Sequence, residues 1–357
     1  MKKDFTSINC DDYKVSFSQR GYQDLKNQLQ KKYSKVFLLV DNNTKKYCLP
    51  HFFKKIQSLA DKTVLTIKAG ESHKHIETCR EVWQKLSDMG ADRKSLLINL
   101  GGGVVSDLGG FVAATFKRGI DFINIPTTLL SMVDASIGGK TGVDLGGLKN
   151  QIGIITNPKL VVVDSFFLKT LPDNEYRSGY AEMLKHGIIK DYKYFKNLIK
   201  YRSFDENDII HYIHNSVSIK NDVVKQDPFE YNFRKILNFG HTLGHAIETH
   251  FLKKTKKSLL HGEAIAIGMI TEAYISSQLT GLRLEVAEEI KTTFLSIFPK
   301  VSFSVEDISH IISLLKYDKK NSHGKVKFVL LKEIGEPVID VEVAEEYFTG
   351  AFEFYKT

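Results

Sequence analysis

The chain has 357 residues, of which 42% are hydrophobic and 26% charged, a composition typical of folded globular proteins. No window approaches the roughly 18 consecutive apolar residues of a membrane span, and the N-terminal MKKDFTSINCDDYK has no apolar core of a secretory signal. Three scattered cysteines without a C-x-x-C pair indicate neither a disulfide framework nor a zinc knuckle. We therefore expect a soluble, cytoplasmic protein without a membrane partner.

The formal net charge of +8 raises the question of nucleic-acid binding. The lysines are spread along the chain, which is more typical of a solvated surface than of a nucleic-acid footprint. The charge also suits an enzyme whose substrate is an anion. We expect a small-molecule substrate and no nucleic-acid partner.

The first half of the chain alternates short β-branched runs with amphipathic stretches. One such stretch, residues 76–89, has helical spacing of its apolar side chains. Alternation of this kind predicts a Rossmann-like α/β domain with a mostly parallel sheet. The predicted strands are residues 36–40, 63–67, 95–100, 121–125 and 160–164.

Helical patterns dominate after Pro172, and one hairpin-like piece, residues 326–331, interrupts them. We predict two domains: an α/β domain over 1–170, and a mainly α-helical domain over 171–357. The predicted helices of the second half include residues 175–189, 208–224, 236–251 and 262–278.

Glycine is concentrated in the middle of the chain, where twelve of the 25 glycines lie between Gly101 and Gly153. Gly101-Gly102-Gly103 follows a predicted strand and precedes a helical pattern, where backbone N–H groups can approach an anion. The run is not G-x-G-x-x-G, so an ordinary dinucleotide fingerprint is not established. Lys140 and Lys149, set in glycine-rich sequence, add point charges suited to phosphate or carboxylate. These features predict an anion site.

Histidine and glutamate recur in the second half in a pattern that favours a metal site. His241 and His245 are four residues apart, so in a helix they share one face. The sequence is not H-E-x-x-H, which argues against zincin proteolysis. His261 and Glu182 lie on neighbouring predicted helices. Spacing alone does not say which three of these four side chains would contact an ion.

Several long motifs together resemble the 3-dehydroquinate synthase family, from about Asp41 to Asp318 and in the expected order. They are GGGVVSDLGGFVAATFKRG, IPTTLLSMVDASIGGKTGVD, GGLKNQIG, SGYAEMLKHGII, RKILNFGHTLGHAIE and HGEAIAIGM. Sugar-phosphate cyclases, and more distantly metal-dependent alcohol and glycerol dehydrogenases, are the wider relatives. A departure from the family pattern is Ser106, where glycine is common.

The resemblance implies NAD and either zinc or cobalt as cofactors. It implies that the domain over 1–170 binds NAD, that the domain over 171–357 binds metal and substrate, and that the active site lies in the cleft between them. It implies that Glu182, His241 and His261 hold the metal, and it assigns His245 to the substrate. The implied NAD positions are Asp41, Asn43, Glu71, Lys74, Gly102, Gly103, Val104, Val105, Ser106, Asp107, Thr127, Thr128, Lys140, Lys149, Phe167, Leu168, Lys169 and Thr170. The implied substrate and catalytic positions are Arg118, Asp134, Lys140, Asn150, Lys185, Lys220, Glu230, Arg234, Asn238, His245 and Lys320, with Lys319 as the neighbouring candidate.

The implied reaction converts 3-deoxy-D-arabino-heptulosonate 7-phosphate to 3-dehydroquinate and phosphate, in the shikimate pathway of aromatic amino acid biosynthesis. It proceeds through transient oxidation by NAD, phosphate elimination, re-reduction and intramolecular aldol closure. Arg118 would reach the partner's active site in a homodimer. A sedoheptulose 7-phosphate cyclase is the alternative, and Lys220, Arg234 and Lys320 as a cationic set favour the carboxylated substrate.

Overall fold

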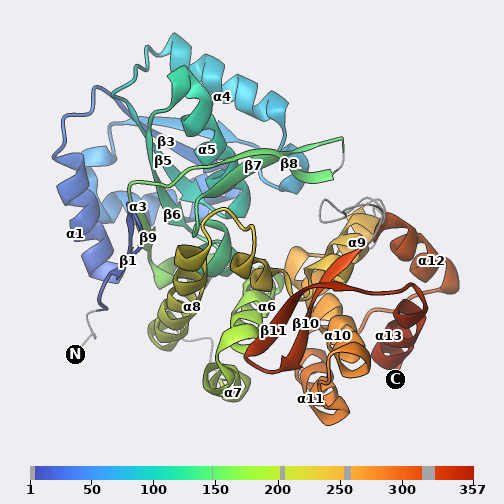
Figure 1. Cartoon of the computed structure of the whole chain (residues 1–357). Helices are drawn as coiled ribbons and strands as arrows, with labels where there is room; N and C mark the ends of the chain where they lie inside the picture. The colour runs from blue at the N-terminus through green and yellow to red at the C-terminus, as the bar shows by residue number, and fades with distance from the viewer. Residues whose placement is uncertain (1–4, 147, 202–205, 253–258, 316–325) are drawn as a thin grey trace. The chain divides into compact units, whose positions relative to one another are not determined.

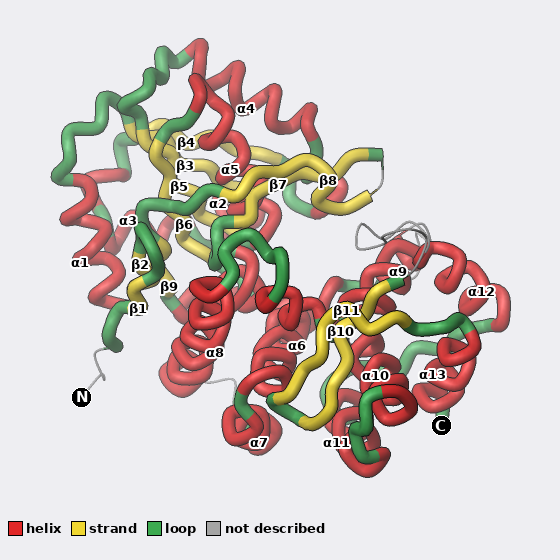
Figure 2. Tube along the Cα trace, viewed as in Figure 1, coloured by secondary structure: helices red, strands yellow, loops and turns green. Residues whose placement is uncertain are grey.

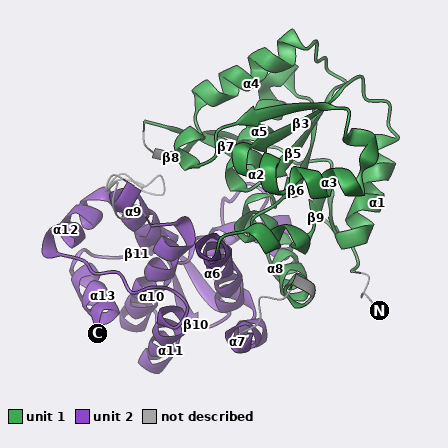
Figure 3. Ribbon diagram, turned by 180° about the vertical axis from the view of Figure 1, so that it is seen from behind, with its two compact units in different colours: residues 1–172, 204–221 green, residues 173–203, 222–357 purple. Residues whose placement is uncertain are grey.

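The computed structural model describes residues 5–146, 148–201, 206–252, 259–315 and 326–357. By its internal contacts the chain divides into two compact units, coloured separately in Figure 3. Unit 1 comprises residues 1–172 and 204–221, and unit 2 comprises residues 173–203 and 222–357. The sequence prediction had a single boundary at 170, whereas residues 204–221 return to the first unit. Each unit is described by itself below.

Unit 1 is built on a seven-stranded sheet with the order β1-β2-β9-β6-β5-β3-β4 (Figure 1). Among the described strands of this seven-stranded sheet, only β1 and β2 pair antiparallel. The predicted mostly parallel sheet is therefore confirmed. All five predicted strands are present, and the short β1 and β2 were missed. The strands are β1 Ile8–Asn9, β2 Lys14–Phe17, β3 Val36–Asp41, β4 Thr63–Ile67, β5 Leu96–Gly101, β6 Asp121–Pro126 and β9 Val161–Val163.

The order of the strands reverses at β3. The chain runs from β3 to its neighbour β4, and then returns to place β5 on the other side of β3. In open parallel sheets, ligands bind outside the carboxyl ends of the strands at such a reversal. The segments that follow β3 and β5 are therefore the first place to look for a bound nucleotide.

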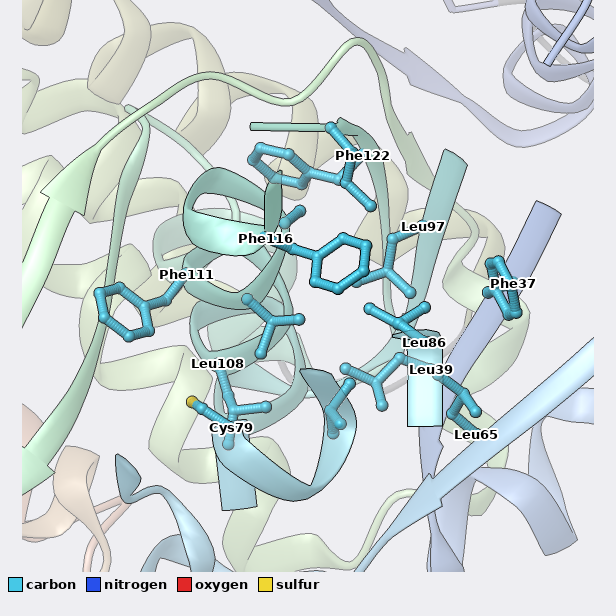
Figure 4. Packing of buried hydrophobic residues seen from close by; sticks show 14 of the residues in the cluster. Phe37, Leu39, Leu65, Cys79, Leu86, Leu97, Leu108, Phe111, Phe116 and Phe122 are labelled. Atoms are coloured by element: carbon cyan, nitrogen blue, oxygen red, sulfur yellow. The ribbon is translucent and has the colours of Figure 1, made fainter. Parts of the chain in front are cut away.

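One face of the sheet is covered by α4 (Ile76–Asp88) and α5 (Gly103–Thr115), which share a buried apolar core with the strands (Figure 4). α4 contributes Cys79 and Leu86 at helical spacing, and α5 contributes Leu108. Phe37 and Leu39 project from β3 into the same core, because alternate residues of a strand share a face. This packing holds the start of α5 beside the carboxyl end of β5.

A separate antiparallel hairpin forms from β7 (Lys140–Leu145) and β8 (Leu148–Ile155), drawn as strands outside the main sheet in Figure 2. The hairpin was not among the strands predicted from the sequence. α5 lies against β7 so closely that a Cβ on Gly110 would come within 2.4 Å of Thr141 Cγ2. The glycine-rich sequence thus serves close packing as well as turns.

The remaining helices of unit 1 are short or lie at its edge. They are α1 Ser18–Leu29, α2 Asn42–Tyr47, α3 Leu49–Lys55, the 3-10 helices Gln57–Leu59, Glu71–His73, Phe116–Arg118 and Ser165–Thr170, and the π-helix Ser131–Ala135. Helix α8 (Glu206–Gln226) belongs to unit 1 up to Asn221.

Unit 2 is mainly helical, as predicted. Its helices are α6 Asp173–Lys190, α7 Tyr192–Lys200, the 3-10 helix η6 Phe233–Asn238, α9 His241–Leu252, α10 His261–Leu279, α11 Leu284–Leu295, α12 Val305–Leu314 and α13 Glu346–Lys356. The hairpin of β10 (Lys327–Glu333) and β11 (Glu336–Glu342) is its sheet. Among the described residues of the chain, no helix is long and apolar enough to span a membrane.

The predicted helix over residues 236–251 is wrong, because the structure divides it. η6 ends at Asn238, Gly240 has φ +79°, and α9 begins at His241. A positive φ is incompatible with a right-handed helix, so the backbone breaks there. The break makes His241 the first residue of its helix.

Helix α10 is apolar around most of its circumference, which is typical of a buried helix. It packs against α9 at very short range, since a Cβ on Gly268 would come within 1.9 Å of the carbonyl oxygen of Gly240. It packs equally closely on α6, where a Cβ on Gly262 would lie 2.2 Å from the carbonyl oxygen of Ser178. Glycine at these positions brings three helices together.

Candidate functional site

Three potential metal-ligating side chains meet inside unit 2. Glu182 lies on α6 and is fully buried, while His241 and His261 are the first residues of α9 and α10. Both imidazoles place Nε2 3.6 Å from Oε1 of Glu182, and one candidate ligand atom from each of the three lies within 4.8 Å of the others. Two imidazole nitrogens and a carboxylate oxygen are a donor set suited to a catalytic zinc or cobalt ion.

The local sequence explains why these side chains meet. The backbone N–H of Gly262 donates to Oγ of Ser178 at 2.9 Å, and Gly262 lets the start of α10 approach the backbone of α6. Ser178 and Glu182 are four residues apart on α6, so they share a face of that helix. The contact at Gly262 therefore brings the neighbouring His261 to Glu182.

Each imidazole is also held at its other nitrogen. Nδ1 of His241 lies 3.1 Å from the carbonyl oxygen of Phe239, and Nδ1 of His261 lies 3.3 Å from Oε2 of Glu248. Burial alone would lower the pKa of His261, but the carboxylates of Glu248 and Glu182 raise it to about 9. Both rings thus have an acceptor at Nδ1 and direct Nε2 toward Glu182.

Lys185 is buried beside the same carboxylate. Its ammonium pairs with Oε2 of Glu182, one turn earlier on α6, and both side chains are almost completely inaccessible. The two oxygens of Glu182 therefore face different neighbours: Oε1 faces the imidazoles and Oε2 faces Lys185.

His245 lies near the same group from the next turn of α9. Its ring centroid is 5.1 Å from that of His241 and 5.8 Å from that of His261. A second cluster of candidate ligands, His245, Glu248 and His261, is also compact. His261 belongs to both clusters: its Nε2 faces Glu182 and its Nδ1 faces Glu248.

A loop before α9 gathers three more of the predicted site residues. Asp227 accepts backbone N–H groups from Tyr231, Asn232 and Arg234 at 2.7 to 3.1 Å, which fixes the loop. Within it, Nδ2 of Asn238 donates to Oε1 of Glu230 at 2.6 Å. Nη1 of the buried Arg234 donates to the carbonyl oxygen of Pro228, also at 2.6 Å.

In unit 1 most of the predicted NAD residues lie at the carboxyl ends of five parallel strands. Asp41 is the last residue of β3 and Asn43 lies just after it, and Glu71 and Lys74 follow β4. Gly102, Gly103, Val104, Val105, Ser106 and Asp107 follow β5, Thr127 and Thr128 follow β6, and Phe167, Leu168, Lys169 and Thr170 follow β9. Because these ends meet at one edge of the sheet, the geometry matches that of a nucleotide site at a strand-order reversal.

Lys74 links this edge to the β7–β8 hairpin. Its buried ammonium lies 2.7 Å from Oδ2 of Asp107 and 2.6 Å from Oδ1 of Asn150. Burial would lower the pKa of Lys74, but Asp107 and Glu71 raise it, so the side chain is cationic. Lys149 pairs with Glu71 across 3.3 Å. Four predicted NAD residues and one predicted substrate residue therefore lie together.

Other predicted site residues occupy separate places in unit 1. Nζ of Lys220 contacts both the carboxylate and the carbonyl oxygen of Asp134 at 2.6 Å. Lys140 is exposed at the start of β7. Arg118 has φ +69° and lines a surface pocket with Asp92, Arg93, Lys94 and Lys117. Lys319 and Lys320 lie outside the described residues.

Sequence reasoning missed several carboxylates of these sites. Glu248 is seven residues after His241, which places both on one face of α9, so its helical spacing was a usable signal. Asp144 accepts the backbone N–H of Asn150 at 2.7 Å, and Asp227 orders the loop before η6. Neither of these two contacts has a periodic pattern in the sequence.

Comparison with known proteins agrees with these features. Residues 64–178 match the family model described as 3-dehydroquinate synthase N-terminal, and residues 179–321 match 3-dehydroquinate synthase C-terminal. The chain is 40% identical over 346 residues to 3-dehydroquinate synthase of Parabacteroides distasonis, covering 94% of this chain and 96% of that protein. The chain belongs to the 3-dehydroquinate synthase family. The same enzyme of Ruminiclostridium cellulolyticum is 40% identical over 85% of each chain.

Solved structures share the fold of this 3-dehydroquinate synthase family member. A 2-deoxy-scyllo-inosose synthase, complexed with carbaglucose-6-phosphate, NAD+ and Co2+, has a TM-score of 0.85 at 22% identity, covering 98% of this chain and 99% of that one. A 2-epi-5-epi-valiolone synthase from Streptomyces hygroscopicus, with NAD+ and Zn2+ bound, has a TM-score of 0.80 at 24% identity, covering 99% of each. The chain is thus an enzyme of this family with a cyclase-type fold.

Proposed function

We propose that this enzyme is a 3-dehydroquinate synthase, which converts 3-deoxy-D-arabino-heptulosonate 7-phosphate to 3-dehydroquinate and phosphate in the shikimate pathway. The observation that carries the proposal is 40% identity to a protein of that name over nearly the full length of both chains. The buried group of Glu182, His241 and His261 supports it, because the chemistry begins at a substrate alcohol that a metal ion would acidify.

The proposed cofactors are NAD and zinc or cobalt. NAD+ with either Co2+ or Zn2+ is present in the two cyclases of the same fold. Glu182, His241 and His261 would hold the metal, and the segments at the carboxyl edge of the unit 1 sheet would hold NAD. When bound, NAD would accept and return a hydride, and the metal would act as a Lewis acid.

The side chains of this chain would bind and orient a substrate that carries a carboxylate and a phosphate. Lys140, Lys185, Lys220 and Arg234 supply cationic donors, for which carboxylate and phosphate are preferred acceptors. Asp134 and Glu230 hold two of the donor groups in place, through Lys220 and Asn238 respectively. Asn150 and His245 complete the proposed polar set, and Lys320 stays a prediction.

Two further features also stay predictions. One is a homodimer in which Arg118 reaches the active site of the partner. The other is the cytoplasmic location expected of a biosynthetic enzyme.

The proposal is tested by phosphate release from the heptulosonate substrate, with and without added NAD and with a chelator. We expect release that requires both NAD and metal, and no net accumulation of NADH, because the hydride is returned in each turnover. Sedoheptulose 7-phosphate is the control substrate. Phosphate release from it and not from the heptulosonate would identify the alternative cyclase, and steady NADH accumulation would indicate a simple dehydrogenase.

A further inference from the structure

Two buried carboxylates outside the proposed ligand set join α9 and α10. Glu248 on α9 is 2% exposed, and Glu272 on α10 is fully buried. Each carboxylate reaches the other helix rather than its own neighbours. Because burial of a carboxylate is costly unless it is hydrogen-bonded, both side chains need specific partners.

The partner of Glu248 is the imidazole of His261. Oε2 of Glu248 lies 3.3 Å from Nδ1 of His261, and Nε2 of the same ring lies 3.6 Å from Glu182. A carboxylate at Nδ1 keeps a proton on that nitrogen, so Nε2 is the nitrogen that loses its proton when a metal binds. It also fixes the plane of the ring.

The partners of Glu272 are backbone N–H groups at the start of α9. Gly240 donates to Oε2 at 2.6 Å and Leu243 donates to Oε1 at 3.0 Å. These N–H groups have no acceptor within α9, and a negative charge is favourable at a helix N-terminus. Glu272 therefore anchors the backbone on both sides of His241.

These contacts from each helix to the other are possible because α9 and α10 lie close together. Gly268 allows α10 to contact the carbonyl oxygen of Gly240 directly, and Gly244 lets α9 approach Ile265. At this range Glu248 of α9 reaches His261 at the start of α10. Glu272 of α10 reaches the backbone next to His241 at the start of α9. Both imidazoles then direct Nε2 toward Glu182.

We propose that Glu248 and Glu272 are positioning residues that hold the imidazoles of His261 and His241 in the orientation for metal binding. The inference rests on the proposed metal site at Glu182, His241 and His261. It goes beyond that site by assigning an effect on metal affinity to two side chains outside the proposed ligand set.

The experiment measures the dissociation constant for zinc of the purified full-length protein, by competition with a chromophoric chelator. We expect Glu248→Ala and Glu272→Gln to weaken zinc binding by about 10- to 100-fold, the usual effect of removing an outer partner of a metal ligand. Glu248→Gln should lose less than Glu248→Ala, because its amide oxygen still accepts from Nδ1. The visible absorption of bound Co2+ should change in the same variants.

Ser276→Ala is the matched control. Ser276 is also fully buried on α10, and its hydroxyl donates to the carbonyl oxygen of Glu272 and accepts from the N–H of Leu331. Its loss should lower Tm but leave the zinc dissociation constant and the Co2+ spectrum unchanged. A purely structural role of Glu248 and Glu272 would make their variants behave in the same way.

The outcomes separate this inference from the proposed function. Zinc affinity within threefold of wild type in folded Glu248→Ala, Glu248→Gln and Glu272→Gln would overturn the inference and leave the proposed function standing. If the wild-type protein bound zinc no better than His241→Ala, the proposed metal site itself would be wrong, and the inference with it.

Discussion

The two units gather their proposed site residues in different ways. Unit 1 places short segments at the ends of five parallel strands, among them Gly102 and Gly103 at the start of α5. Unit 2 places titratable side chains inside a helical core, where Glu182, Glu248, Glu272 and Lys185 are almost completely buried. The first arrangement suits a large ligand that needs backbone access, and the second suits a small ion that needs fixed charges.

The largest effect is expected from removing one proposed metal ligand in unit 2. We expect His241→Ala to lose zinc and activity together, with zinc affinity falling by more than the roughly 100-fold upper range for outer partners. Metal analysis of the purified variant and the phosphate-release assay measure this. Retention of stoichiometric zinc by His241→Ala would remove this histidine from the ligand set.

The matching test in unit 1 concerns the proposed anion site. Lys140→Ala should retain metal but lose about 10- to 100-fold in activity, because one charge-assisted contact to substrate or cofactor is worth about 1.5 to 3 kcal/mol. Lys31→Ala, at another exposed lysine of unit 1, is the control and should retain activity. Zinc loss in Lys140→Ala would contradict the separation of the two units' roles.

Close packing offers a comparison of similar substitutions in the two units. Gly268→Ala drives a Cβ against a backbone oxygen of another helix, and should cost about 3 kcal/mol in the free energy of unfolding. Gly110→Ala meets the side-chain methyl group of Thr141 and not a backbone atom, and should cost less, about 1 kcal/mol. Urea denaturation measures both, and equal costs would show that the helices of unit 2 can separate slightly.

The smallest expected effect is the pH dependence due to Asp227. Burial would raise the pKa of Asp227, but the backbone N–H groups of Asn232, Arg234 and Tyr231 lower it. Its stabilising contribution is therefore complete above the unfolded pKa of about 4, and is lost as pH falls through the lower folded value. The difference in free energy of unfolding between wild type and Asp227→Asn should be constant from neutral pH to about pH 5, and shrink in acid. A difference that persisted unchanged in acid would contradict this role.

Local patterns predicted the elements that local forces determine. Buried apolar runs predicted five strands of the sheet, β3, β4, β5, β6 and β9, and the spacing of Cys79, Val82 and Leu86 predicted α4. The β7–β8 hairpin was missed because glycines interrupt the alternation that marks a strand. The break at Gly240 was missed because apolar spacing continues across it.

The candidate sites were also predictable only as far as local patterns reach. Motifs supplied the residue types, but the proximity of Glu182 to His261 depends on packing between α6 and α10, which no local pattern encodes. The buried carboxylates Glu248 and Glu272 look like surface residues in sequence, since glutamate is rarely buried. The return of residues 204–221 to unit 1 is a nonlocal contact of the same kind.

Because residues 204–221 belong to unit 1, the gene cannot be divided into the two units by one cut. A fragment ending at Pro172 would lack α8, and so would lose the contacts of Lys220 with Asp134, Asn221 with Asn9 and His214 with Thr6. The complementary fragment would carry those residues of α8 without their partners. Independent expression of the two halves therefore requires a graft of 204–221 onto the first fragment, rather than a single cut.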